Sequence, residues 1–106
     1  MSAYFIAQIK INDPEEYEKY LKGFDDIFEK FKGEVVAVDD NPTTLEGVWD
    51  YTRIVIIRFP NERELRLWYD SPEYQSLAQH RFNASQANVL IVEGRDWRKE
   101  EYIETL

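Results

Sequence analysis

The chain has 106 residues, of which 43% are hydrophobic and 15% aromatic, so it is long enough for one packed domain and too apolar for disorder. Its 13 basic and 21 acidic residues give a formal charge of -8, which disfavours nucleic acid and anionic membranes as partners. Cysteine is absent, which excludes disulfides and thiolate chemistry. The first residues carry no basic segment before an apolar run, so we expect a soluble cytoplasmic protein.

The N-terminal residues predict a strand and then a helix. Residues 3–11 place apolar side chains on one face and mixed side chains on the other, which is typical of a strand. Asp13 and Pro14 suit the N-cap and the first position of a helix. Apolar residues then recur at helical spacing from Tyr17 to Phe31, and Gly33 is expected to end the helix.

The middle of the chain predicts strands separated by a turn. Residues 34–38 read as a short strand, and residues 39–42 have the composition of a turn. Residues 45–49 predict a further strand or a bulge. Residues 51–59 are strongly apolar and predict a long strand that Pro60 terminates.

The C-terminal part predicts a second helix in two pieces and a last strand. Asn61 is a suitable cap, but the stretch WYDSPEYQ at 68–75 interrupts the helix, because the residue before a proline resists helical backbone angles. Serine before proline also caps a new helix. Residues 88–92 predict the last strand, and a charged tail follows at 95–106. The second piece is expected to bury Tyr74, Leu77, Ala78, Phe82 and Ser85.

This β-α-β-β-α-β order predicts a ferredoxin-like α+β domain over residues 1–94, with an antiparallel sheet and both helices on one face. Three strands are apolar on both faces, whereas a half-solvated antiparallel sheet alternates apolar with polar residues. Only a short tail remains to cover the second face, so we expect a second copy to cover it. The sequence therefore predicts a homodimer in which two sheets form a dimeric α+β barrel.

Several segments carry a family resemblance: DPEEYEKY (13–20), LEGVW (45–49), RFPNERELRLWYDSPEYQ (58–75) and VEG (92–94). In their order and spacing, from about residue 3 to residue 94, the chain resembles the uncharacterised family called domain of unknown function 1330. The resemblance implies the dimeric α+β barrel superfamily, whose members include cofactor-independent monooxygenases, small lactone isomerases and haem-binding enzymes. It implies a fold more than a reaction.

Arg81 is the most informative candidate for a site. It falls on the same helical side as Tyr74 and Leu77, where a charge is costly unless it is paired or reaches water. One interpretation is a clamp for a substrate carboxylate or enolate, because the planar guanidinium matches such groups. The alternative is a salt bridge to Glu73, to Glu93 or to a partner chain.

The remaining candidates surround Arg81 in the expected arrangement. Trp49 is a pocket wall or, alternatively, a dimer anchor or core ring, and Arg58 is an inward cation. Tyr17 and Tyr20 are core positions first, and either phenol would be a general acid only if a cavity opened under it. The predicted pocket set is Trp49, Arg58, Trp68, Tyr69, Tyr74 and Arg81.

Metal and cofactor chemistry has little support in the sequence. His80, the only histidine, falls off the buried side of its helix and has no carboxylates at ligand spacing. We therefore predict neither a metal site nor a cofactor. Two functions stay open: a cofactor-independent enzyme acting on a small organic molecule, and a non-catalytic module that binds a small ligand or a protein. A cavity between the second helix and the sheet would favour the first.

Overall fold

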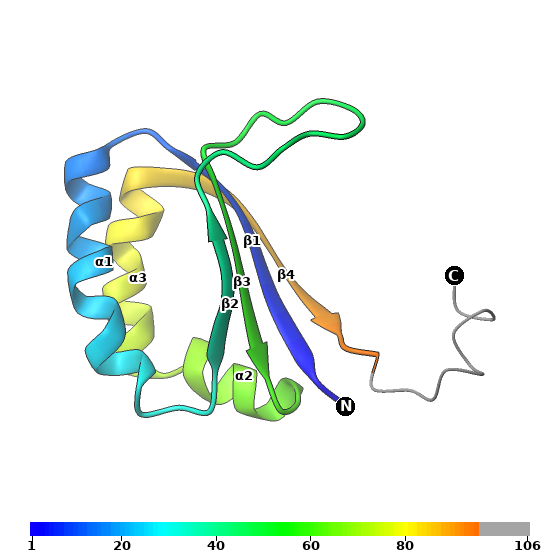
Figure 1. Ribbon diagram of the computed structural model, residues 1–106. Helices are drawn as coiled ribbons and strands as arrows, with labels where there is room; N and C mark the ends of the chain where they lie inside the picture. The colour runs from blue at the N-terminus through cyan, green and yellow to red at the C-terminus, as the bar shows by residue number, and fades with distance from the viewer. Residues whose placement is uncertain (96–106) are drawn as a thin grey trace, which may run out of the picture.

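The protein folds into a four-stranded antiparallel sheet with its helices on one side (Figure 1). The computed structural model describes residues 1–95. The strand order is β2-β3-β1-β4. The elements in chain order are β1 (Ala3–Ile11), α1 (Pro14–Phe28), β2 (Glu34–Asp39), β3 (Arg53–Phe59), α2 (Glu62–Tyr69), α3 (Pro72–Ala84) and β4 (Ser85–Glu93). The predicted ferredoxin-like order is confirmed, with the second helix divided into α2 and α3.

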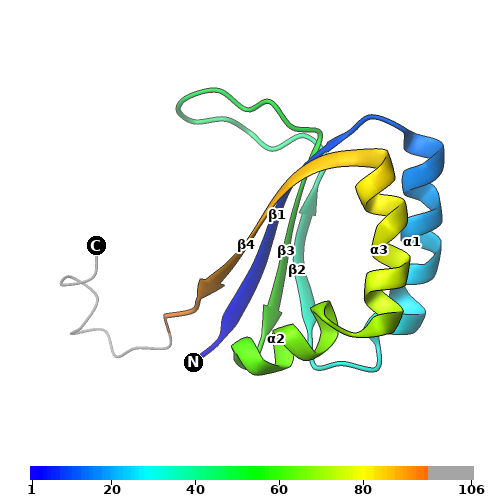
Figure 2. The same cartoon turned by 180° about the vertical axis from the view of Figure 1, so that it is seen from behind.

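Each helix begins at the residue that the sequence indicated. The side chains of Asp13, Asn61 and Ser71 each accept a hydrogen bond from the backbone N–H three residues further on, at 3.2, 2.9 and 3.2 Å. Helix α1 ends at Phe28, earlier than Gly33, and Phe31 lies beyond it. In Figure 2, α1 and α3 lie side by side over the sheet and α2 lies at one end of it.

The segment 45–49 forms no strand, contrary to the prediction. It belongs to a loop that joins β2 to β3 and projects away from the helices (Figures 1 and 2). Gly47 has a φ of 84°, and Leu45 and Val48 are 93% and 94% exposed. The physical reason lies in the sheet order: β2 and β3 pair directly with each other, so the segment between them is the connecting loop of a hairpin and takes no place in the sheet.

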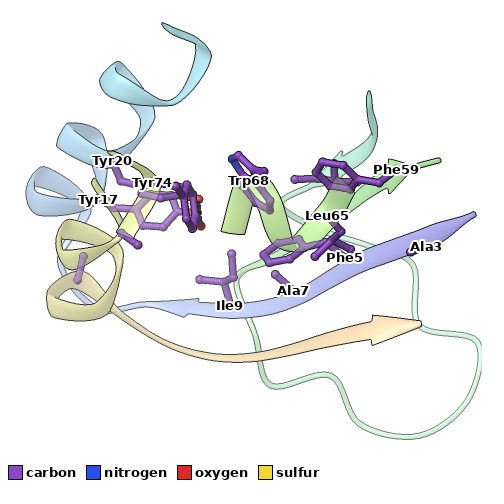
Figure 3. Packing of buried hydrophobic residues seen from close by; sticks show 13 residues of the cluster. Ala3, Phe5, Ala7, Ile9, Tyr17, Tyr20, Phe59, Leu65, Trp68 and Tyr74 are labelled. Atoms are coloured by element: carbon purple, nitrogen blue, oxygen red, sulfur yellow. Dashed lines mark hydrogen bonds between the residues drawn. The ribbon is translucent and has the colours of Figure 1, made fainter. Parts of the chain in front are cut away.

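The face of the sheet that carries the helices, here called the inner face, holds an aromatic core. Trp68 is fully buried at its centre. Its indole stacks on Phe59 at 5.5 Å between ring centroids, meets Phe5 edge-on at 5.2 Å and lies 4.3 Å from Tyr74 (Figure 3). Trp68 thus ties α2 to two strands and to α3, and its role is to fix the layers.

The opposite face of the sheet, here called the open face, is also apolar. It presents Ile6, Ile54, Ile56, Leu90 and Val92, because these residues alternate with the buried ones along β1, β3 and β4. Leu90 is 59% exposed and Val92 40%. No element within residues 1–95 covers this face.

Replacing Trp68 with alanine should cost about 3 to 5 kcal/mol of the free energy of unfolding, because it leaves a large cavity in the aromatic core. Chemical unfolding at fixed protein concentration measures the loss. Leu67→Ala is the matched control, since Leu67 is the neighbouring residue of α2 and is 49% exposed. Equal losses in the two variants would contradict the central role given to Trp68.

Candidate ligand-binding site

A cavity of about 300 Å³ lies between α1 and the inner face of the sheet. Strands β1 and β3 form its floor, and α1 and α3 form its roof. Apolar side chains make up most of the wall, which is usual for sites that bind small organic molecules. The residues around it are Phe5, Ala7, Ile9, Tyr17, Tyr20, Leu21, Phe24, Asp25, Val35, Val38, Arg53, Val55, Ile57 and Arg81.

The cavity opens to solvent along the β2 edge of the sheet. Leu21 and Asp25 of α1 and Val35 and Val38 of β2 line it and are themselves exposed. Strand β2 is an edge strand, so no further strand closes the space between it and α1. A small molecule could therefore enter between α1 and β2 without the layers separating.

Arg81 brings an unpaired cation to the inner end of this cavity. It is 3% exposed, and its Nε and Nη2 have no hydrogen-bond partner among the described residues. Glu73 pairs instead with Lys30 at 2.7 Å, and no carboxylate within residues 1–95 forms an ion pair with Arg81. The predicted salt bridge to Glu73 or Glu93 is thus absent. A buried cation without a counter-charge is costly and provides a binding site for an anion.

The position of Arg81 follows from where α3 begins. Ser71 caps that helix, and Tyr74, Ala78 and Arg81 then follow at spacings of four and three, which place them on one buried side. Phe82, which the sequence placed on this side, is 43% exposed. The Arg81 guanidinium lies against the rings of Tyr20 and Phe82, at 5.8 and 5.0 Å from their centroids.

Two buried phenols connect α1 to α3 beside the guanidinium. The hydroxyls of Tyr20 and Tyr74 are 2.7 Å apart and point toward one another (Figure 3). Burial and the neighbouring phenol raise the pKa of Tyr20 well above its usual value. Burial also raises the pKa of Tyr74, although the Arg81 charge partly offsets this effect. Both hydroxyls are therefore protonated at neutral pH and can donate hydrogen bonds.

The pKa of Arg81 is raised as well. Burial on its own would lower it, but the hydroxyls of Tyr74 and Tyr20 outweigh that effect. The guanidinium keeps its charge inside the protein, as expected for arginine.

A second arginine at the cavity is already neutralised. The side chain of Arg53 points to the inner face and donates to both carboxylate oxygens of Asp40, at 2.7 and 3.2 Å. It also lies over the ring of Tyr17, 5.5 Å from the centroid. Among the cations lining the cavity, Arg81 is thus the one that lacks a carboxylate within the described chain.

The structure brings few of the six predicted pocket residues to the cavity. Arg81 lines it, and Tyr74 lies directly behind Tyr20. Trp68 is a core residue, and Tyr69 is half-buried next to β4 beside smaller hollows. Trp49 lies in the β2–β3 loop with its ring 4.9 Å from that of Tyr51.

Arg58 is not the inward cation that the sequence suggested. It pairs with Tyr4 on the open face, is exposed and donates to the Ser2 Oγ at 2.9 Å. Side chains alternate along β3, and because Ile57 and Phe59 are buried on the inner face, Arg58 must point the other way. The same alternation turns Arg53 inward.

Tyr17 and Tyr20 are the lining residues whose role the sequence left conditional on a cavity, and that cavity is present. His80 lies outside the lining, with its Nδ1 2.6 Å from the Glu16 Oε2. Within residues 1–95 there is no group of three or more metal-ligating side chains, and no helix there is long and apolar enough to cross a membrane.

Together, the sheet order, the helices on one face and the apolar cavity between α1 and the sheet define a ferredoxin-like α+β protein with a space for a small ligand. The chain belongs to the family described as Domain of unknown function (DUF1330), whose model matches residues 2–95. No curated protein is found to match the chain.

Solved structures share this fold at low sequence identity. One is a protein of unknown function from Rhodopseudomonas palustris, with 17% identity, a TM-score of 0.70, and coverage of 90% of this chain and 83% of that chain. Another is SnoaB, a cofactor-independent oxygenase from Streptomyces nogalater, with 14% identity, a TM-score of 0.65, and coverage of 92% of this chain and 97% of that chain. A third is a dimeric ferredoxin-like protein of unknown function from Thermobifida fusca, with 14% identity, a TM-score of 0.62, and coverage of 89% of this chain and 92% of that chain.

Arg81→Met should stabilise the ligand-free protein by about 1 kcal/mol or more, because methionine fills the space of the arginine stem without burying an unpaired charge. Chemical unfolding measures the change. In the control, Arg66→Met removes an exposed arginine that pairs with Glu62, and its effect should stay within about 0.5 kcal/mol. A loss of several kcal/mol in Arg81→Met would mean that the guanidinium has a structural partner.

Proposed function

We propose that this protein binds a small organic anion, with the charged group at Arg81 and the apolar body in the cavity between α1 and the sheet. The observation that carries the proposal is the buried guanidinium with two unpartnered nitrogens at the end of an apolar space. A carboxylate, enolate or phenolate supplies the missing counter-charge, and arginine is the side chain best suited to such groups.

The dimensions and wall chemistry of the cavity favour a compact ligand. About 300 Å³ is at the lower end of the range for small-molecule sites. The walls are aliphatic and aromatic apart from the two arginines, the tyrosine hydroxyls and Asp25 at the mouth. A ligand with one polar end and a short apolar or aromatic body matches this arrangement.

Catalysis on the bound anion without a cofactor is a second candidate function. The specific observation in its favour is the pair of neutral phenols, since a protonated hydroxyl beside a substrate oxygen can act as a general acid. The oxygenase SnoaB has the same fold, and at 14% identity that likeness is an analogy only. Simple binding without turnover is the alternative.

We also propose that the protein forms a homodimer through the open face, in the cytoplasm. The supporting observation is the set of aliphatic residues on this face, exposed on β4 and partly exposed on β1 and β3, which no element within residues 1–95 covers. A second copy of the same face is a self-complementary cover. The Thermobifida fusca protein, which shares this fold, is described as dimeric, and this supports the same assembly here.

Benzoate should raise the melting temperature of the wild-type protein, whereas benzamide, which has the same ring and no charge, should not. Isothermal titration should show that Arg81→Met weakens benzoate binding at least about tenfold, because one charge-assisted contact is lost. Arg66→Met is the control, since this exposed arginine of α2 pairs with Glu62 and does not line the cavity. Equal binding of benzoate to the wild type and Arg81→Met would refute the assignment.

Leu90→Asp should convert the dimer to a monomer, because a two-fold interface places the new charge twice in an apolar contact. Light scattering at micromolar concentration measures the mass. Leu67→Asp is the matched control, because Leu67 is similarly exposed but belongs to α2, and it should stay dimeric. A monomeric wild-type protein at this concentration would disprove the proposed assembly.

A further inference from the structure

We propose that the cavity stabilises the ionised form of a weak organic acid, a phenol or an enol, and that the Tyr20 hydroxyl donates directly to its oxygen. This inference rests on the proposed anion site and identifies its ligand class. The residues that carry it are Tyr20, Tyr74 and Arg81, which form a continuous polar line from α3 to the cavity wall.

In the ligand-free protein either hydroxyl can donate to the other, and an anion in the cavity fixes the direction together with Arg81 at the inner end of the line. A guanidinium has donors only, so the Tyr74 oxygen next to Arg81 is the acceptor side of that hydroxyl. The Tyr74 proton can then be directed to the Tyr20 oxygen, 2.7 Å away. The Tyr20 proton is left for a group in the cavity, which Tyr20 lines and Tyr74 does not.

Burial makes this donor effective. Tyr20 is 6% exposed and Tyr74 is fully buried, so little water competes for the hydroxyls. Hydrogen bonds in such surroundings are electrostatically stronger than in water and polarise one another. Burial also raises the pKa of both phenols, which keeps them protonated while the ligand ionises.

The other charged groups around the cavity leave the inner end positive. Asp25 is exposed at the mouth, on the far side from α3, and Arg53 is neutralised by Asp40. The part of the floor that β1 contributes is apolar, with Phe5, Ala7 and Ile9, and the β2 edge adds Val35 and Val38. A ligand oxygen placed at the inner end therefore meets Arg81 and the Tyr20 hydroxyl, and no described carboxylate.

A phenol or an enol gains more from such a site than a carboxylic acid does. A carboxylic acid is already ionised in water at neutral pH, so the site changes only where it binds. A phenol or enol is largely neutral, and donors aimed at a single oxygen shift its ionisation toward the anion. On ionisation the O–H bond breaks, the electron pair stays on oxygen and the proton passes to water at the mouth.

The test uses 4-nitrophenol, whose anion absorbs visible light and whose neutral form does not. With the wild-type protein in excess, the apparent pKa of the bound probe should fall by about one unit or more, a roughly tenfold shift toward the anion. Tyr20→Phe should remove most of this shift. Tyr74→Phe should remove part of it, because Tyr20 keeps its contact but loses the donor behind it.

Tyr51→Phe is the matched control, because it also deletes one tyrosine hydroxyl that makes a 2.7 Å hydrogen bond, to Asn88, away from the cavity. It should leave the probe spectrum unchanged. An unaltered shift in Tyr20→Phe overturns the inference, and so does a probe that binds in its neutral form. If benzoate binds and 4-nitrophenol is not ionised, this inference fails alone. If neither compound binds, the proposed function fails with it.

Discussion

The burial of the Arg81 guanidinium without a carboxylate partner among residues 1–95 is the constraint on which the candidate site depends. A charge in this position opposes folding, and the surrounding chain compensates with two phenols and two aromatic ring faces. A methionine or leucine would pack there at lower cost. The proposed anion site gives a reason for an arginine at this position, and the size of the cavity fits a small molecule.

The break between α2 and α3 places this cation. Asp70 and Ser71 end one helix and cap the next, so α3 starts with its own rotation about the helix axis. That rotation turns Tyr74 and Arg81 toward the sheet, while Trp68, three residues before the cap of α3, closes the core at the other end. The stretch WYDSPEYQ thus contributes no catalytic group of its own to the cavity lining. Its role is to set the orientation of Tyr74 and Arg81 relative to the sheet.

Local patterns in the sequence determine the elements but not which residues share a cavity. The strand Ala3–Ile11 and the caps Asp13, Asn61 and Ser71 are predictable because each rests on neighbouring residues alone. The loop at 45–49 has strand-like composition, and only the sheet order shows that it connects two strands that already pair with each other.

The same limit explains the incomplete pocket prediction. Whether Arg53 or Arg58 points inward depends on the register of β3 against β1, and a one-residue change in register exchanges the two faces. Tyr20 meets Tyr74 across 54 positions of sequence, a distance that no local pattern spans. Arg81 was identifiable from sequence because its unfavourable position on a buried helix side is itself a local signal.

The two faces of the sheet connect the proposed ligand site to the proposed assembly. Phe5, Ala7 and Ile57 form the cavity floor, and Ile6 and Ile56 alternate with them on the same two strands. Any cover on the open face therefore packs directly behind the floor, one side chain away from the ligand. Close-packed layers transmit small displacements. A second copy bound to the open face would therefore fix the distance between the sheet residues of the floor and the side chains of Tyr20 and Arg81. The depth of the cavity, and with it the fit of a compact anion, would then depend on assembly even though every lining residue comes from one chain.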